Sequence, residues 1–290
     1  MASANPTLAP APGVIATRKV SARLPFGVVV SLLYLAVLTL AVVAPGLLAT
    51  QDPLFSDVTR ALLPPSLHNP LGTDHLGRDV LTRIIHGARY SLFIGVASTV
   101  LGVAVGVVLG LVAGASHRLV NEGISRFFDV IGAFPDLLFA LMLITFTGPG
   151  TWNLIFAIGI ASAPRYGRIV RAETLRVKES EYVAQARLTL TSGVRNAVKH
   201  ILPNALGTVP ILATLGVGTA ILGAAGLSFL GFGPEPPQPE WGSMLSEARS
   251  DLRVAWWAGF FPGLFITLTV IAVSVVGRHL QLRFERRREA

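Results

Sequence analysis

The sequence contains no cysteine, and only 14% of its 290 residues are charged. The absence of cysteine excludes disulfides, thiolate catalysis and zinc sites built on cysteine. An ordinary soluble domain carries about 25% charged residues, so this chain has too few charges to cover a water-soluble surface. Lipid is the simpler solvent for a chain that is 52% hydrophobic, with a mean hydropathy of +0.62.

Motifs of several enzyme classes are also missing. The pattern G-x-x-x-x-G-K-[ST] does not occur, so the chain is not expected to hydrolyse ATP. Neither H-E-x-x-H nor G-x-S-x-G occurs, which argues against two common hydrolase sites. His68, His75 and His86 share one polar segment, but no carboxylate–histidine spacing there supports a metal site. We therefore expect no catalytic, cofactor-binding or metal-binding residues in this chain.

Long apolar runs, by contrast, are abundant. A spanning helix needs about 20 mostly apolar residues, and the turn signal Gly148-Pro149-Gly150 divides one run into two helices. Spans are expected at residues 24–49, 90–115, 125–147, 151–171, 204–230 and 254–277. Residues 1–23 are expected to form a disordered tail and residues 278–290 a basic tail. The sequence thus predicts an all-α membrane protein with about six transmembrane helices.

The net charge of +8 is distributed unevenly along the chain. Cytoplasmic loops of membrane proteins carry an excess of Lys and Arg. With the N-terminus inside, 18 of the 24 Lys and Arg residues lie in the two tails, in residues 117–126 and in residues 165–200. This asymmetry explains the basic charge without nucleic acid, and it predicts that both termini are cytoplasmic.

Glycines and aspartates stand out within the expected spans. Small residues spaced by four share a helix face and allow another helix to approach closely. In span 90–115 these residues are Gly102, Gly106, Gly110 and Gly114. Asp129 and Asp136 are seven residues apart and are expected to share a face, with capping and packing as the favoured interpretation. So few ionisable groups inside the membrane argue against a proton-driven carrier.

The longest segment expected in the cytoplasm, residues 172–203, carries two apolar stripes at helical spacing. One stripe begins at Tyr182 and the other at Val194, and Ser192 is a suitable N-cap for the second helix. This pattern predicts a helix-turn-helix elbow. Its apolar face requires either a protein partner or the membrane surface, and charge alone does not separate these alternatives.

Several separated motifs resemble the inner-membrane permeases of binding-protein-dependent ABC importers. They are N-P-L-G-T-D-H-L-G-R-D-V-L-T-R at 69–83, G-A-R-Y-S-L at 87–92, F-D-V-I-G-A-F-P at 128–135, E-Y-V at 181–183, H-I-L-P-N at 200–204, G-L-S-F-L-G-F-G at 226–233 and E-W-G at 240–242. Within that family they are similar to the C-type subunit of the dipeptide, oligopeptide and nickel branch. The resemblance covers about residues 24–277. It implies the type I ABC importer permease fold, with a cytoplasmic coupling helix, in the bacterial inner membrane.

The resemblance also implies a division of roles among several subunits. A substrate-binding protein docks outside, this chain and a second permease subunit form the pathway as a heterodimer, and two cytoplasmic ATPases bind ATP and Mg. The chain itself would need no cofactor. The implied ATPase-coupling residues are Glu181, Tyr182, Ala186, Arg187, Leu190, Gly193, Leu202 and Pro203. The implied family signature of the extracytoplasmic segment is Gly72, Thr73, Asp74, Gly77, Arg78 and Asp79.

The coupling segment departs from the family pattern. The family's Glu-Ala-Ala sequence falls on Ala184-Gln185-Ala186, and its following glycine falls on Leu190, which lacks the backbone freedom of glycine. Gly193 is available to form the turn instead, so the elbow geometry and the identity of the partner ATPase stay open.

The main interpretation is a permease subunit of an ATP-driven importer for di- or oligopeptides. One alternative is the same role in a nickel or metal-chelate importer, because substrate choice is set largely by the binding protein. The others are a proton-coupled carrier working alone and a membrane scaffold without a pathway.

Overall fold

A computed structural model describes residues 24–179, 207 and 209–289 of the chain. The part of the chain that it describes is helical and contains no β-strand, as the all-α prediction requires. The α-helices are α1 (Phe26–Val43), α2 (Val80–Ala115), α3 (Arg118–Gly132), α4 (Asp136–Thr147), α5 (Thr151–Lys178), α9 (Val209–Leu227), α10 (Trp241–Ala248) and α11 (Trp256–Glu289). Short 3-10 turns lie at Pro45–Leu47 and Val58–Arg60, and a π-turn at Ser228–Phe232 continues α9.

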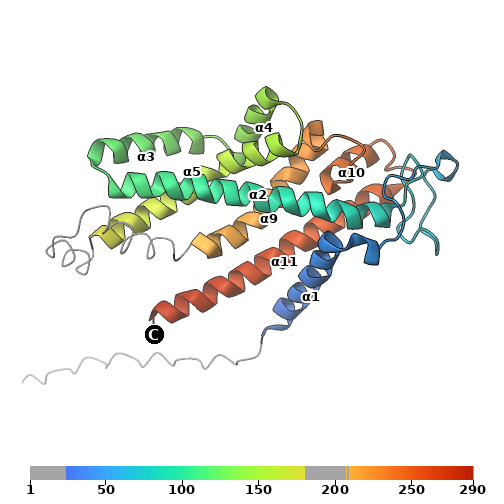
Figure 1. Ribbon diagram of the computed structural model, residues 1–290, viewed down its shortest axis with the longest axis horizontal. Coiled ribbons are helices and arrows are strands. Elements are labelled where there is room, and N and C mark those ends of the chain that lie inside the picture. The colour runs from blue at the N-terminus through green and yellow to red at the C-terminus, as the bar shows by residue number, and fades with distance from the viewer. Residues whose placement is uncertain (1–23, 180–206, 208, 290) are drawn as a thin grey trace, which may run out of the picture.

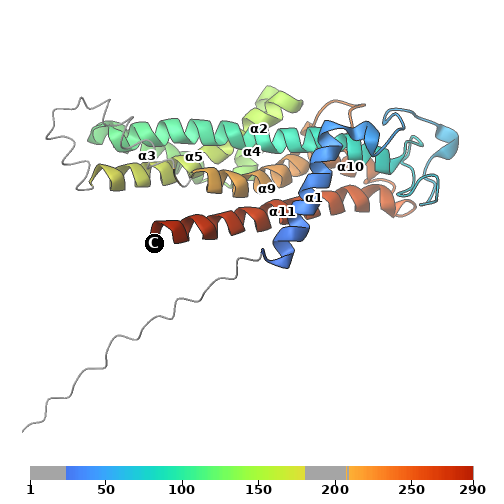
Figure 2. The same cartoon turned by 60° about the horizontal axis from the view of Figure 1, so that its bottom comes forward.

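Four long helices, α2, α5, α9 and α11, run along the long axis of the molecule (Figure 1). α2 packs against α5 and α9, and α9 packs against α11. α1 crosses α11, as Figure 2 shows. Buried apolar side chains around Trp241 join α10 to α1, α2 and α11, and a second cluster around Leu154 joins α5 to α4 and α9.

The apolar helices are numerous enough for a multi-pass membrane protein. Among the described residues, four helices are long and apolar enough to cross a membrane, or five if the bent pair of α3 and α4 forms one span. The remaining expected span, residues 151–171, corresponds to α5, which has 28 residues. Its second half carries Arg165, Arg168 and Arg171, and these basic residues lower its mean hydropathy below that of the other spans.

Several helices extend beyond the bounds expected from the sequence. α2 begins at Val80, ten residues before the expected start, because the Asp79 side chain accepts a hydrogen bond from the Thr82 backbone N–H (2.8 Å) and caps the helix. α5 continues to Lys178, and α11 continues to Glu289 through the segment expected to be a tail. Apolar runs mark the part of a helix that lipid can surround, and they do not mark where the helix ends.

The helix expected over residues 125–147 is not continuous, although its two parts together are apolar enough to form one bent span. α3 ends at Gly132, α4 begins at Asp136, and the two helices are bent by 90°. Pro135 lies between them, and a proline has no N–H to continue the helical hydrogen bonds of the preceding turn. The bend also separates Asp129 from Asp136, so these two residues do not share a helix face as their spacing predicts.

The four glycines of α2 face α5. A Cβ at Gly102 would lie 2.8 Å from the Gly159 carbonyl oxygen, one at Gly106 would lie 2.7 Å from that of Ala163, and one at Gly110 would lie 2.5 Å from that of Gly167. A Cβ at Gly114 would lie 2.6 Å from the Cβ of Thr174. The backbones of α2 and α5 therefore approach each other at a distance that only glycine permits along this face.

Replacing Gly106 by alanine is expected to destabilise the α2–α5 contact by roughly 1 to 3 kcal/mol, because the added methyl group meets the backbone of α5. The measurement is the thermal unfolding midpoint of the purified protein in detergent. Gly123→Ala is the matched control, since a Cβ at Gly123 on α3 meets no atom within 4 Å. The control gains the same helix propensity without a clash. Equal midpoints for the two variants would contradict the close approach.

Candidate functional site

The loop between α1 and α2, residues 44–79 and here called the first loop, carries all six residues of the expected extracytoplasmic signature. It turns sharply at Gly72 (φ +77°) and Gly77 (φ +74°), in the left-handed region that favours glycine. A Cβ at Gly77 would meet the backbone carbonyl of Asp57. Glycine at position 77 therefore also allows these two segments of the loop to pack closely. These turns bring Thr73, Asp74 and Arg78 to the start of α2.

Thr73 and Asp79 fix the first loop to the helices. The Thr73 side chain is fully buried, and its hydroxyl accepts a hydrogen bond from the Leu63 backbone N–H (2.8 Å). The Trp257 indole N–H of α11 donates to the Thr73 carbonyl (3.1 Å). Asp79 caps α2 and also accepts a hydrogen bond from the Asn69 side-chain amide (2.8 Å). The loop is thus bound to both α2 and α11.

A buried cluster of four charges lies where the first loop meets α2 and α10. Arg78 donates from Nε to Asp74 (2.7 Å) and from Nη2 to Glu247 of α10 (2.6 Å). Arg83 of α2 donates from Nη1 to Asp74 (2.5 Å) and to Glu247 (2.9 Å). Asp74 is 7% exposed and Arg83 is 1% exposed. Two carboxylates and two guanidinium groups compensate one another, as burial of charge requires.

Asp74 remains ionised in this cluster. Burial alone would raise the pKa of its carboxyl, but the charges of Arg78 and Arg83 and the backbone hydrogen bond from Arg78 lower it further, so the pKa lies below its ordinary value. His75 lies beside Asp74 and Glu247 with ligand atoms within 4.8 Å, a grouping that could hold a metal ion. A cation bound there would have to displace two guanidinium groups from the carboxylates, so the arrangement favours an ion-pair cluster over a metal centre.

α10 is held to α2 through its first residues, which belong to the E-W-G motif. Glu240 is 1% exposed, and its carboxylate accepts hydrogen bonds from the Gly242 and Ser243 backbone N–H groups (both 2.9 Å) and from the Ser91 hydroxyl of α2 (3.0 Å). The Trp241 indole donates to the Ile84 carbonyl of α2 (2.9 Å). The first loop, α10 and the start of α2 therefore form one polar structure at the same end of the bundle (Figure 1).

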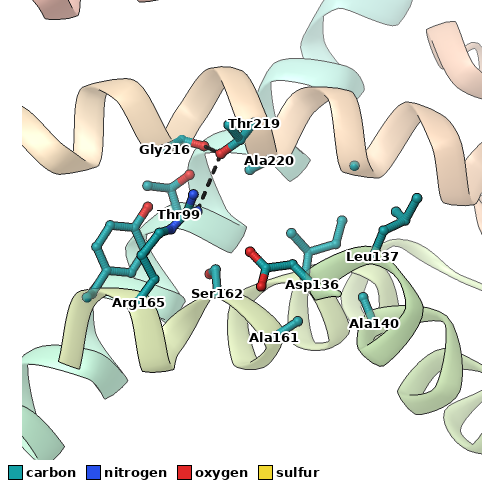
Figure 3. Close-up of a pocket in the computed structure, with 13 residues that line it drawn as sticks. Thr99, Asp136, Leu137, Ala140, Ala161, Ser162, Arg165, Gly216, Thr219 and Ala220 are labelled. Atoms are coloured by element: carbon teal, nitrogen blue, oxygen red, sulfur yellow. Dashed lines mark hydrogen bonds between the residues drawn. The ribbon is translucent and has the colours of Figure 1, made fainter. Parts of the chain in front are cut away.

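A cavity of about 200 Å³ lies between α2, α4, α5 and α9 (Figure 3). Its walls combine small and apolar side chains with a few polar and charged ones. The lining residues are Thr99, Asp136, Leu137, Ala140, Ile158, Ala161, Ser162, Arg165, Tyr166, Gly216, Thr219, Ala220 and Gly223. The side chains of Asp136 and Arg165 are exposed, so the cavity is open to the surface of this chain.

Asp136 and Arg165 bring one charge of each sign to this cavity. Asp136 is the first residue of α4, directly after the break at Pro135. Arg165 lies in the middle of α5, with Nη2 3.5 Å from the Thr219 hydroxyl of α9 and with Cζ 5.4 Å from the centre of the Tyr166 ring. In the described part of the chain no ion pair joins Asp136 to Arg165.

The sequence alone does not reveal this cavity. The count of Lys and Arg residues assigns Arg165 to the cytoplasmic segment. In the structure, its neighbour Tyr166 instead packs against Gly102 and Gly106, within the apolar part of α2. The available signal was an arginine inside the expected span 151–171. Asp129, the other aspartate of the expected spans, is exposed on α3 and does not line the cavity.

The predicted coupling residues lie outside the described residues. They are Glu181, Tyr182, Ala186, Arg187, Leu190, Gly193, Leu202 and Pro203. Their coupling role is therefore supported only by the sequence and stays a prediction. The described helices that lead towards this segment are α5, which ends at Lys178, and α9, which begins at Val209.

Comparison with known proteins gives consistent results. Residues 106–290 match the family described as "Binding-protein-dependent transport system inner membrane component". The chain is 40% identical to the dipeptide transport system permease protein DppC of Alkalihalophilus pseudofirmus, over 83% of this chain and 79% of that protein. It is 44% identical to the di/tripeptide transport system permease protein DppC of Pseudomonas aeruginosa, over 73% and 70%. It is 37% identical to the glutathione transport system permease protein GsiD of Pectobacterium atrosepticum, over 88% and 84%.

Solved structures resemble the fold. A chain of the MetNI methionine ABC transporter in an inward-facing conformation matches with a TM-score of 0.58 and 16% identity, over 71% of this chain and 96% of that chain. A chain of an amino acid ABC transporter determined with histidines matches with a TM-score of 0.55 and 16% identity, over 70% and 94%. At this level of identity the similarity concerns the fold alone.

Proposed function

Because the chain belongs to the family of binding-protein-dependent transport system inner membrane components, we propose that it is one of two permease subunits of an ATP-driven importer for di- or oligopeptides. The predicted ABC importer permease fold is confirmed by the structural neighbours. The observation that carries the proposal is the 40% identity, over 83% of this chain, to a permease named for dipeptide transport.

The names of the relatives favour a peptide substrate over nickel. Two of them are named for dipeptides or tripeptides, and a third is named for glutathione, which is itself a tripeptide. The nickel alternative has no comparable support. Because the binding protein selects the substrate, the length and side chains of the peptide are set largely outside this chain.

ATP hydrolysis belongs to other subunits in this proposal. The chain has no G-x-x-x-x-G-K-[ST] sequence to hold a nucleotide. Two cytoplasmic ATPases bind ATP and Mg, and residues 181–203 transmit their movement to the permease. A second, different permease subunit completes the pathway, and a substrate-binding protein delivers the peptide from outside.

The distribution of charge supports an orientation for the chain. α2, α5 and α11 end at the same end of the bundle, opposite the first loop (Figure 1). This end includes Arg176, Lys178 and Arg278, and Lys and Arg collect on the cytoplasmic side of membrane proteins. Both termini then lie in the cytoplasm, and the first loop and α10 face the binding protein.

Copurification tests the proposal directly. The chain is tagged at its chromosomal gene and extracted from the source organism in mild detergent. It is expected to retain a second permease subunit and two ATPase subunits. Mass spectrometry of the eluate identifies them. A chain that elutes alone, and that transports peptide alone in liposomes, would support the stand-alone carrier instead.

A further inference from the structure

The cavity between α2, α4, α5 and α9 lies deep in the expected membrane region. Thr99, which lines it, is nine residues after Tyr90 and 16 residues before Ala115, the ends of the charge-free part of α2. At 1.5 Å per residue these separations are about 14 Å and 24 Å. The cavity that contains the Asp136 carboxylate and the Arg165 guanidinium therefore lies far from both ends of this charge-free part of α2.

The side chains of Asp136 and Arg165 are not expected to face lipid. A charged side chain in the hydrocarbon core is costly, so such residues face a bundle interior or a water-filled path. Both side chains are exposed in the single chain, and neither pairs with the other within 4 Å among the described residues. Figure 3 shows the Asp136 carboxylate pointing into the cavity and Arg165 reaching across it to Thr219. Each charge is thus available to a ligand of opposite charge.

We propose that this cavity is a substrate subsite of the transport path, in which Asp136 binds the terminal ammonium group of a peptide and Arg165 binds its terminal carboxylate. The inference rests on the proposed function, because it takes a zwitterionic peptide as the substrate. It goes further by naming a site in this chain and the two charged groups that recognise the peptide ends.

The remaining walls of the cavity suit a path that accepts many peptides. Leu137, Ala140, Ile158 and Ala161 offer apolar surface without a specific hydrogen-bond pattern. Thr99 and Thr219 add hydroxyl groups on the opposite helices. The volume of about 200 Å³ is below the roughly 300 to 1,000 Å³ of usual ligand pockets. The proposed subsite therefore requires the second permease subunit to close the open side and to provide the rest of the space.

A single introduced cysteine tests binding without the binding protein. The chain has no cysteine of its own, and a Cβ at Gly223, which lines the cavity, meets no atom within 4 Å. Labelling of Gly223→Cys by a small methanethiosulfonate reagent is followed on this chain by mass spectrometry, in the complete complex. A free dialanine peptide at ten times its measured Kd is expected to slow labelling about tenfold.

The control substitution for this experiment is Gly123→Cys on α3, where a Cβ also meets no atom and no cavity residue is near in sequence. Its labelling rate is expected to be the same with and without peptide. N-acetyl-dialanine amide carries neither terminal charge, and it is expected to give no protection of Gly223→Cys. Equal protection by the charged and uncharged peptides, or none by either, would overturn the subsite.

Charge-neutral variants test the two residues in transport. In proteoliposomes with the complete complex and peptide-loaded binding protein, Asp136→Asn and Arg165→Gln are each expected to lower dialanine uptake about ten- to a hundredfold. ATP hydrolysis is expected to stay within twofold of wild type, since the coupling segment is unchanged. Asp129→Asn and Arg168→Gln are the matched controls outside the cavity, and they are expected to keep both activities.

The outcomes separate the subsite from the proposed function. Wild-type complex that takes up no peptide would contradict the proposed function itself. Normal uptake by Asp136→Asn and Arg165→Gln in a working complex would overturn the subsite alone. A third outcome is that both variants lose uptake and ATP hydrolysis together, and that peptide does not protect Gly223→Cys. This outcome would assign Asp136 and Arg165 to folding or coupling, and it would also overturn the subsite.

Discussion

The Asp74→Asn variant is expected to lose roughly 3 kcal/mol of folding free energy, because breaking a buried ion pair leaves a charge uncompensated. Asp74 accepts hydrogen bonds from both Arg78 and Arg83, so its neutralisation leaves two guanidinium groups with Glu247 alone. The value is at the lower end of the usual range because Glu247 stays in place and is partly exposed. Thermal or denaturant unfolding of the purified protein in detergent measures the loss.

The pH dependence of stability provides the check on this mechanism. The arginine charges hold the pKa of Asp74 below its ordinary value, so the carboxylate stabilises the fold at pH values above about 4, and this stabilisation is lost as the pH falls further. That acid-dependent loss is expected to be absent from Asp74→Asn. Asp52→Asn, an exposed aspartate of the same loop, is the control and should change stability much less. Equal losses in the two variants would contradict the cluster's role.

The Ala186→Asp variant is expected to lower ATP-driven peptide uptake at least about tenfold, since a carboxylate on the apolar face of the coupling segment would be buried without a partner when an ATPase docks. Ala186 belongs to the residues outside the structural description, so the prediction follows from the sequence and the family. Uptake into proteoliposomes is compared with the amount of chain inserted in the membrane, measured by immunoblot. Insertion is expected to be normal.

Two further variants complete this test. Ala186→Ser keeps a small side chain without a charge and is expected to retain most of the uptake. Deletion of residues 181–199 is expected to abolish uptake and to release the ATPases during purification. Undiminished ATP-driven uptake by Ala186→Asp would place the coupling function elsewhere in the chain.

Much of the fold follows from the sequence because apolar length is a strong physical constraint. The glycine spacing from Gly102 to Gly114 predicts a helix face for close packing, and the structure places α5 against that face. The turn at Gly148-Pro149-Gly150 separates α4 from α5 as its residues predict. In both cases the predictive signal lies in a few residues that are close together in the sequence.

The parts that the sequence does not predict depend on distant contacts. Pro135 permits either a kink or a full break, and only packing decides that α4 leaves α3 at 90°. Glu247 has no local feature that pairs it with Arg78 and Arg83, which are more than 160 residues away. Arg165 looks cytoplasmic by charge counting, yet its neighbour packs against the middle of α2. Long-range proximity of this kind leaves no periodic pattern.

Peptide uptake with separated components tests the central claim most directly. The complete complex in liposomes, supplied with binding protein and internal ATP, is expected to accumulate a labelled dipeptide, and the same liposomes without ATP are expected to accumulate none. The chain reconstituted alone is expected to be inactive under every condition, including an imposed proton gradient. Accumulation by the chain alone would contradict a permease subunit driven by separate ATPases.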